Sequence, residues 1–321
     1  MAAVPKRVVR RDDGPFMNRL AGLIAATFTP LQADGSLALE RIDAYADFLL
    51  RQRLTAVFVC GTTGESLSLS TAERMQVTER WQEVLAGQLP VIVNVSHNSL
   101  ADGRALAEHA QRIGAAAISA MAPCFFKPAL PELVVFAGAI AAAAPRLPFY
   151  FYHIPSLTGV SWPMARFLEA AGDKIPTLAG LKFTFEDLMD LQNCLRLNSG
   201  RYQILFGRDE ILLAGLALGC RGAVGSTYNF AAPLYQQVIA AFQAGDLPRA
   251  QAHQQRAVQM ISLAVKYGGL PAMKALMRLH GVECGPVRLP LRALTAAEQR
   301  NLELEWRALN SVPVVAAVVA G

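Results

Sequence analysis

Eight short apolar runs alternate with helix-like segments before residue 245, and this alternation constrains the fold more than any other feature. The runs are rich in β-branched residues and apolar at consecutive positions: 21–27, 56–60, 90–95, 116–121, 148–152, 178–183, 203–206 and 222–225. Strands that are apolar on both faces are typical of parallel sheets, because helices cover such sheets on each side. The alternation therefore predicts an α/β protein built on a parallel sheet.

Helix-start signals lie between the predicted strands. Ser70 is followed by Glu73, and Ser99 by Asp102, and both pairs match the S/T-x-x-E/D capping pattern before apolar residues at helical spacing. Eight strand–helix units within about 225 residues are typical of a (β/α)8 TIM barrel. A doubly wound open sheet is the alternative, but no G-x-G-x-x-G motif follows the first strand. We therefore expect a TIM barrel.

The last part of the chain has helical spacing without strands. Helices are predicted over 246–267, 271–280 and 295–309, the last beginning with the capping pair Thr295 and Glu298. We expect these helices to form an appendix to the barrel. The predicted organisation is thus an N-terminal extension over 1–19, which we expect to be flexible, a barrel with the active site over 20–245, and a C-terminal helical region with an apolar tail over 246–321.

Composition and charge limit the classes of partner. The chain is 53% hydrophobic and 17% charged, which allows a large core and excludes global disorder. No basic run is interleaved with aromatic residues, so we expect no nucleic acid partner. The first 19 residues lack the apolar segment of a secretory signal. The apolar tail over 312–321 is shorter than the roughly 20 residues that cross a bilayer, so we expect no membrane association.

Cysteines and histidines give no sign of disulfides or of a metal centre. The five cysteines are scattered, odd in number and without a C-x-x-C pair, as is typical of reduced thiols in a cytoplasmic protein. The five histidines show no spacing such as H-E-x-x-H. We therefore expect a cytoplasmic protein without a metal site.

Lys182 is the first candidate for chemistry, because it lies near the end of the sixth predicted strand among apolar residues. In a TIM barrel the active site lies at the carboxyl ends of the strands. Burial favours the neutral amine, and a neutral lysine attacks ketones to give a Schiff base. The alternative is a strand-end lysine that extends to solvent. By strand parity, Gly180 faces the same way as Lys182, and we expect it to leave room below the amine.

Position in the chain argues against the other lysines as candidates for the Schiff base. Lys127 follows the fourth predicted strand and is the rival by position, but its neighbours Phe126 and Pro128 indicate a loop that packs with its ammonium in water. The remaining lysines fall in the N-terminal extension, in a helix-to-strand loop at the opposite end of the barrel, or in the C-terminal helices: Lys6, Lys174, Lys266 and Lys274.

Two other predicted strand ends carry groups that suit such a lysine. Tyr152 ends the fifth strand, where its phenol could relay protons at a carbinolamine or an imine. The alternative is an aromatic side chain that only fills the barrel. Thr62 and Thr63 lie between glycines after the second strand, where amides and hydroxyls could converge on a carboxylate. Their alternative is an ordinary turn.

Four ordered motifs together resemble the pyruvate-dependent class I aldolase family, which includes N-acetylneuraminate lyase and dihydrodipicolinate synthase. The resemblance extends over about residues 20–291. It implies a TIM barrel, usually a homotetramer, in which Lys182 forms a Schiff base with pyruvate, Tyr152 shuttles protons, and Thr62 and Thr63 hold the carboxylate. No separate cofactor is implied. The motifs are Gly61-Thr62-Thr63-Gly64-Glu65, Tyr152-His153-Ile154-Pro155, Gly180-Leu181-Lys182-Phe183-Thr184 and Gly225-Ser226-Thr227-Tyr228-Asn229.

Departures from the synthase pattern bear on the substrate. The synthase has an arginine where this chain has Leu157, and a tyrosine borrowed from a neighbouring subunit where this chain has Phe125 and Phe126. The run from Gly207 to Glu210 instead resembles the G-x-D-E motif of the sialic acid lyase branch. The resemblance implies that these residues bind the sugar hydroxyls together with Thr184 and Ser226. For Asp209 and Glu210 the alternative is a stabilising charge at a helix N-terminus.

The expected function is the reversible cleavage of N-acetylneuraminate to N-acetylmannosamine and pyruvate, with a small-molecule substrate as the partner. One alternative is another 2-keto-3-deoxy sugar acid aldolase or dehydratase, or a dihydrodipicolinate synthase-like enzyme, which would share the Schiff base. A further alternative is a non-catalytic ligand-binding or regulatory barrel.

Overall fold

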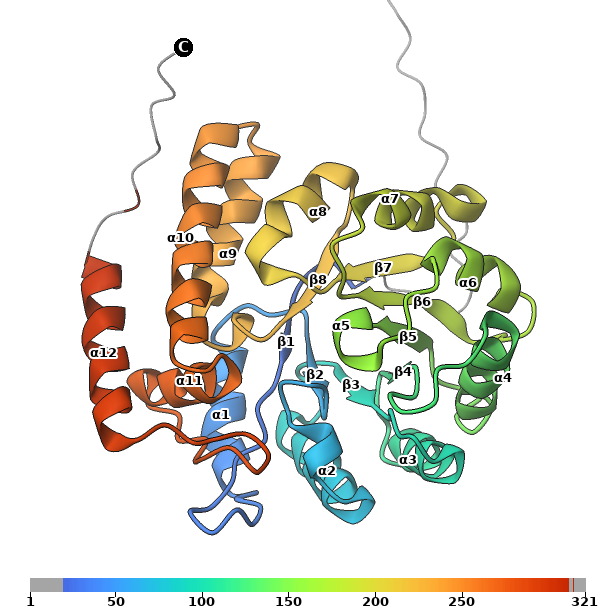
Figure 1. The fold of residues 1–321 in the computed structure, drawn as a ribbon, viewed down its shortest axis with the longest axis horizontal. Coiled ribbons are helices and arrows are strands. Elements are labelled where there is room, and N and C mark those ends of the chain that lie inside the picture. Colours follow the sequence, from blue (N-terminus) through green and yellow to red (C-terminus); the bar gives the residue numbers. More distant parts are fainter. Residues whose placement is uncertain (1–19, 312–313, 315–321) are drawn as a thin grey trace, which may run out of the picture.

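The computed structural model describes residues 20–311 and Val314, and a closed barrel of eight parallel strands lies at its centre (Figure 1). Each strand pairs with the next, and the last pairs with the first. The predicted TIM barrel is therefore confirmed, and each strand lies within one residue of its predicted bounds. The strands are β1 (Gly22–Ala26), β2 (Ala56–Val59), β3 (Val91–Asn94), β4 (Ala117–Met121), β5 (Phe149–His153), β6 (Leu178–Phe183), β7 (Gln203–Phe206) and β8 (Gly222–Gly225).

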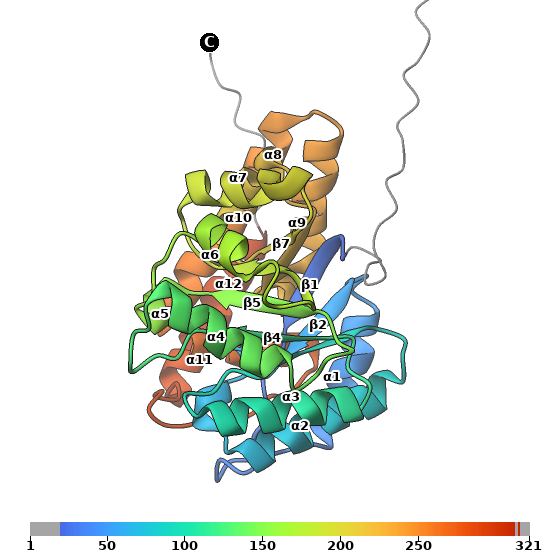
Figure 2. The ribbon, with the colours of Figure 1, turned by 90° about the vertical axis from the view of Figure 1, so that its right-hand side faces the viewer.

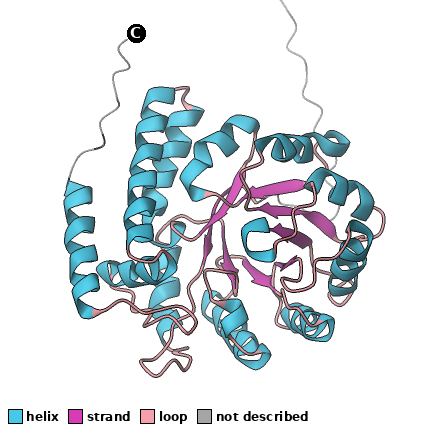
Figure 3. Ribbon diagram, viewed as in Figure 1, coloured by secondary structure: helices cyan, strands magenta, loops and turns pink. Residues whose placement is uncertain are grey.

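Helices surround the strands on all sides (Figure 3). Between residues 20 and 311, four are single 3-10 turns: η1 (Ser66–Ser68), η2 (Leu197–Ser199), η3 (Asp209–Ile211) and η4 (Met277–His280). The α-helices of the described residues are α1 (Arg41–Leu50), α2 (Thr71–Leu85), α3 (Leu100–Arg112), α4 (Leu130–Ala141), α5 (Pro155–Thr158), α6 (Met164–Ala171), α7 (Leu188–Arg196), α8 (Leu212–Leu218), α9 (Tyr228–Gln243), α10 (Leu247–Lys266), α11 (Leu270–Leu276) and α12 (Ala296–Ser311). In the view turned by 90°, α2, α3 and α4 lie side by side along the barrel wall (Figure 2).

Two of the predicted helix starts form complete capping boxes. The Ser70 hydroxyl accepts a hydrogen bond from the Glu73 amide, and the Glu73 carboxylate accepts one from the Ser70 amide. Thr295 and Glu298 exchange the same two bonds before α12. These contacts satisfy amides that the first helical turn leaves without partners, which explains why α2 and α12 begin where they do.

Alternation along the strands separates two apolar layers. On β6, Leu181 and Phe183 pack among the helices. The inward positions of the other strands supply a separate cluster inside the barrel, which includes Phe58 and Tyr152. Lys182 faces this interior, because its amine contacts both of those rings. The strand parity inferred from the sequence therefore places the lysine inside the barrel.

Gly180 serves a different purpose from the one predicted. A Cβ atom at this position would lie 1.8 Å from the Gln203 carbonyl oxygen on β7, so the backbone of the neighbouring strand requires the glycine. The layer below Lys182 is filled, since the Tyr150 hydroxyl donates to Gln203 Oε1 at 2.8 Å. The expectation that Gly180 leaves room under the amine is therefore wrong.

The C-terminal helices pack against one side of the barrel, where α10 lies along α9 (Figure 1). Their ranges agree with the predicted helices, except that the second is divided into α11 and η4. Within residues 20–311, none of the helices combines the length and the apolar character that a membrane crossing needs. The predicted flexible extension over 1–19 and the apolar tail, apart from Val314, lie outside the described residues.

Candidate active site

One cavity of about 320 Å³ at the carboxyl ends of the strands collects all the residues singled out from the sequence. They come from five different strand ends and the loops that follow them, which only the closure of the barrel brings together. This volume lies at the lower end of the range for small-molecule sites. The lining includes Thr62, Thr63, Tyr152, Lys182, Thr184, Gly207, Asp209, Glu210 and Ser226.

Lys182 is 4% exposed, and its amine lies between two aromatic rings. The Nζ atom is 4.0 Å from the ring centroid of Phe58 and 4.0 Å from that of Tyr152. Burial lowers the pKa of Lys182 below its ordinary value, while the Tyr152 phenol and the Asp209 carboxyl act in the opposite direction. The lowered pKa makes the neutral, nucleophilic amine more available.

Tyr152 places its hydroxyl beside the loop that follows β2. Its oxygen lies 3.3 Å from Thr62 Oγ1, and either group can be the donor. The ring is 3% exposed, whereas Thr62 is exposed at the cavity. Thr62 and Tyr152 can therefore exchange a proton or bind one ligand atom between them, next to the Lys182 amine.

Thr63 and Ser226 join the ends of β2 and β8. Their hydroxyl oxygens lie 2.6 Å apart. Thr63 is buried, and Ser226 is half-buried. The contact fixes one edge of the cavity and leaves each hydroxyl with further hydrogen-bonding capacity for a ligand.

Asp209 is a buried carboxyl held by the next strand–helix unit. Its Oδ2 atom accepts from the Thr227 amide at 3.0 Å and from the Thr227 hydroxyl at 2.6 Å. A Cβ atom on Gly225 would lie 2.0 Å from Asp209 Oδ1, so the glycine is needed for this position. Burial raises the pKa of Asp209 to about 6, while the bonds from Thr227 favour the ionised form. Asp209 is thus bound to the N-cap residue of α9 on the neighbouring strand end, so it lies at a helix N-terminus and also lines the cavity.

Glu210 lies at the rim of the same cavity in an ion pair. Arg208 contacts Glu210 at 3.0 Å and also contacts Glu186. Gln254 on α10 donates to the backbone carbonyls of Asp209 and Glu210 at 3.1 and 3.0 Å. The C-terminal region thus holds the turn that carries both carboxylates.

Thr184 and Gly207 form a matched pair between β6 and β7. A Cβ atom on Gly207 would lie 2.0 Å from Thr184 Oγ1. That hydroxyl is buried and has no hydrogen-bond partner among the described residues. A buried polar group without a partner is costly, so a ligand hydroxyl in the cavity would satisfy it.

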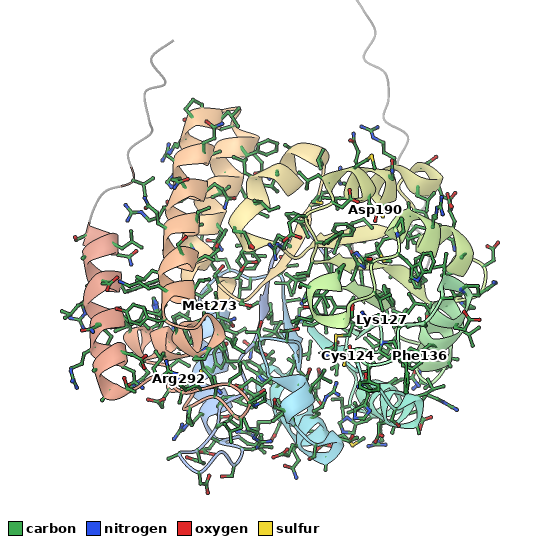
Figure 4. The ribbon with its side chains drawn as sticks, viewed as in Figure 1. Cys124, Lys127, Phe136, Asp190, Met273 and Arg292 are labelled. Carbon is green, nitrogen blue, oxygen red and sulfur yellow. The ribbon has the colours of Figure 1, made fainter. Side chains whose placement is uncertain are left out.

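Sequence reasoning missed the wall of the cavity that comes from outside the barrel. Ile261 and Val265 on α10, and Leu270 and Met273 on α11, line the cavity together with the strand ends. Figure 4 marks Met273 on α11. Phe58 was also missed, because an inward phenylalanine on β2 looks like ordinary barrel packing. No spacing in the sequence connects α10 or α11 with the strand ends.

The rival lysines behave as predicted, with one addition. Lys127 and Lys174 are exposed, and Lys266 forms an ion pair with Glu305 near the surface. Lys274 is buried, with a side chain 1% exposed, and it pairs with Glu65 of the β2 loop. Burial alone therefore does not single out Lys182, but Lys182 is the lysine that lines the cavity.

The positions that argued against a synthase lie on the surface. Phe125 and Phe126 are 77% and 80% exposed, and their rings contact each other edge to face at 5.0 Å. Leu157 is 54% exposed.

In the described part of the chain, no three His, Cys, Asp or Glu side chains are grouped closely enough to hold a metal ion. The arrangement suits covalent chemistry on a keto acid through Lys182.

Comparisons with known proteins agree with this geometry. Residues 19–308 match the model of the dihydrodipicolinate synthetase family. The N-acetylneuraminate lyase of Rattus norvegicus is 43% identical over 298 residues, which are 91% of this chain and 93% of that protein. The N-acetylneuraminate lyase of Proteus mirabilis superposes with a TM-score of 0.90 at 43% identity, over 92% of this chain and 100% of that one. A dihydrodipicolinate synthase of Bacillus anthracis gives a TM-score of 0.85 at 25% identity, over 92% and 100%.

Proposed function

Because the chain belongs to the dihydrodipicolinate synthetase family, we propose that it is a Schiff-base aldolase that reversibly cleaves N-acetylneuraminate to N-acetylmannosamine and pyruvate. One observation carries the proposal: the Lys182 amine is buried between Phe58 and Tyr152 in a cavity lined by hydroxyls and carboxylates. The similarity to proteins named N-acetylneuraminate lyase, at 43% identity, supports the choice of substrate.

The loop after β2 binds the keto acid end of the substrate. The amides and hydroxyls of Thr62 and Thr63 receive the carboxylate, which directs the C2 ketone towards Lys182. The neutral amine attacks C2 to give a carbinolamine. Loss of water then gives a protonated imine. The buried position of Lys182 aids the first step, since it lowers the pKa of the amine.

Cleavage follows because the protonated imine accepts electrons. The C3–C4 bond breaks, its electron pair forms the enamine C2–C3 double bond, and C4 becomes an aldehyde as its hydroxyl loses a proton. The proton goes to the oxygen of Tyr152 or to the substrate carboxylate beside it. The sugar leaves, C3 is reprotonated, and water hydrolyses the imine to pyruvate and free Lys182.

The remaining polar residues bind the hydroxyls of the long sugar chain. Asp209 and Glu210 accept hydrogen bonds from them, and the unpartnered Thr184 hydroxyl and Ser226 extend the same surface. Gly207 leaves the space that Thr184 needs. A short keto acid would leave these groups without ligands, so we propose that they select a polyol.

Two rival functions share the fold. Another 2-keto-3-deoxy sugar acid aldolase, or a synthase-like enzyme, would use Lys182 in the same way, but Leu157 and Phe125 offer neither a carboxylate-binding cation nor a proton relay. A non-catalytic barrel would bind ligands without forming an imine.

We also propose a cytoplasmic homotetramer that needs no added cofactor. The five free cysteines favour the reducing compartment.

Rates on different substrates test the assignment. The purified protein is assayed for pyruvate release from N-acetylneuraminate and from shorter 2-keto-3-deoxy acids. The proposal predicts a much higher kcat/KM for N-acetylneuraminate. Asp209→Ala should reduce this rate far more than it reduces imine formation with pyruvate. Equal turnover of the short acids would contradict the lyase assignment.

A further inference from the structure

A second buried lysine lies behind the cavity, where it pairs with the glutamate of the β2 loop. Lys274 Nζ is 2.8 Å from Glu65 Oε1, and both side chains are 1% exposed. Buried ion pairs contribute little net stability, because desolvation offsets their attraction. Such a pair therefore requires an explanation in terms of geometry.

The pair joins the loop after β2 to two segments near the C-terminus, which lie more than 200 positions further along the chain. Glu65 Oε2 accepts a hydrogen bond from the Arg288 amide at 2.7 Å, and Lys274 Nζ donates to the Pro286 carbonyl at 2.6 Å. The loop after β2, helix α11 and the chain after η4 are thus fixed to one another. Bonds between charged groups and amides or carbonyls are stronger and more directional than neutral ones.

On one side, the pair controls the loop that carries the two threonines. Glu65 is in the left-handed region, with a φ of 56°, and its amide donates to the Thr62 carbonyl at 3.0 Å. The Thr29 hydroxyl donates to the Gly64 carbonyl at 2.7 Å. Left-handed backbone is costly for a residue with a side chain, and the bonds of the Glu65 carboxylate to Lys274 and to the Arg288 amide act together with these backbone bonds to hold it.

On the other side, the pair fixes α11, which forms part of the cavity wall. Met273, the neighbour of Lys274, lines the cavity, as does Leu270. Lys274 faces away from the cavity towards Glu65 and is not among the lining residues. The ion pair therefore connects two borders of one site, and neither of its residues lines the cavity.

We propose that Glu65 and Lys274 form a positioning pair that holds Thr62 and Thr63 in place for the carboxylate of a 2-keto acid, in register with the apolar wall of α11. The inference rests on the proposed function of the same site. Neither residue contacts the substrate. Their effect is on binding of the keto acid, whereas Lys182 and Tyr152 carry out the chemistry.

Trapping with borohydride measures this binding directly. Pyruvate and borohydride convert the imine to a stable secondary amine, and the pyruvate concentration for half-maximal trapping is determined. Lys274→Met and Glu65→Gln should raise that concentration about tenfold or more, since small misplacements of binding groups can cost about a hundredfold. The maximal extent of trapping should not change, because Lys182 is intact.

A double variant separates positioning from folding. Single variants leave one buried charge without its partner and can prevent folding. Glu65→Leu combined with Lys274→Met removes both charges, so it should fold with a Tm near that of the unmodified protein. Its half-maximal trapping should still require a higher pyruvate concentration than that of the unmodified protein. Half-maximal trapping at the unmodified concentration would overturn the proposal.

A double-mutant cycle tests whether Glu65 acts through the threonines. If it does, Glu65→Gln adds little to the effect of Thr63→Ala, whereas additive effects would contradict the proposal. Glu305→Gln is the matched control, because it removes the α10–α12 ion pair with Lys266 and should leave trapping unchanged. If the unmodified protein forms no adduct, the proposed function fails. An adduct with unchanged half-saturation in the variants contradicts only the positioning pair.

Discussion

The Nζ atom of Lys182 on β6 lies 4.0 Å from the ring centroid of Phe58, which is on β2 at the opposite side of the barrel. This contact has two opposing effects on the amine. The ring keeps water away, which lowers the pKa of Lys182. Its electron-rich face also attracts the protonated form, which raises the pKa by a smaller amount.

Substitutions at Phe58 should separate these effects. Phe58→Leu keeps water out but removes the ring, so it should lower the pKa of Lys182 further. Phe58→Ala opens the interior to water from the adjoining cavity. Because desolvation outweighs a cation–π contact of about 0.5–2 kcal/mol, the pKa should then rise. The pH dependence of borohydride trapping measures both shifts, and shifts in the same direction would contradict this account.

Removing the Lys182 amine should stabilise the protein in a pH-dependent manner. The folded-state pKa lies below the ordinary 10.5, so below pH 10.5 the unfolded chain binds a proton that the folded chain does not. The unmodified protein therefore loses stability relative to Lys182→Met as pH falls from about 10.5 through the folded-state pKa. The gain should reach about 1–3 kcal/mol, the usual cost of a buried polar group.

Thermal unfolding of both proteins between pH 10.5 and pH 7 measures this gain. Lys127→Met removes an exposed lysine and serves as the control. Its Tm should equal that of the unmodified protein at each pH in this range. A Tm difference between Lys182→Met and the unmodified protein that is absent or constant with pH would show that the amine is not desolvated.

Asp209 should give the pH profile of sugar acid cleavage its acidic limb. Burial raises the pKa of Asp209 to about 6. In the proposed function, the ionised form is the one that accepts hydrogen bonds from the sugar hydroxyls. The value of kcat/KM for N-acetylneuraminate should therefore fall as pH drops through about 6. Asp209→Asn should be less active and should lack this limb. Persistence of the limb in the variant would assign it to another group.

Gly225 should control the position of the Asp209 carboxylate. A Cβ atom at Gly225 would lie 2.0 Å from Asp209 Oδ1, so Gly225→Ala must displace that carboxylate. Cleavage of N-acetylneuraminate should drop by about tenfold or more, while pyruvate trapping on Lys182 remains. Gly138→Ala is the matched control, since its Cβ meets Ile175 at an ordinary 3.5 Å. Equal activity of both variants would contradict this role.

The barrel could be predicted because each strand carries its own signal. Runs such as 178–183 are apolar on both faces, and the capping pair of Ser70 and Glu73 marks the following helix at short range. These local patterns determine the number and order of the strands. Once eight parallel strands close, the ends that carry Thr62 and Lys182 must face one cavity.

The rest of the site depends on contacts between distant segments, which leave no spacing in the sequence. Met273 reaches the cavity only because α11 packs against the barrel. Glu65 meets Lys274 across 209 positions of the chain, so neither residue points to the other in the sequence. The predicted role of Gly180 was wrong. The close approach of Gln203, which requires this glycine, depends on the register of β6 and β7 and leaves no local pattern in the sequence.

Reduction with borohydride in the presence of pyruvate, followed by peptide mapping, tests the central claim most directly. The account predicts one pyruvyl adduct per chain, located on Lys182, and none in Lys182→Met. The buried Lys274 and the exposed Lys127 should remain unmodified. Absence of an adduct, or an adduct on another lysine, would contradict a Schiff-base mechanism at Lys182.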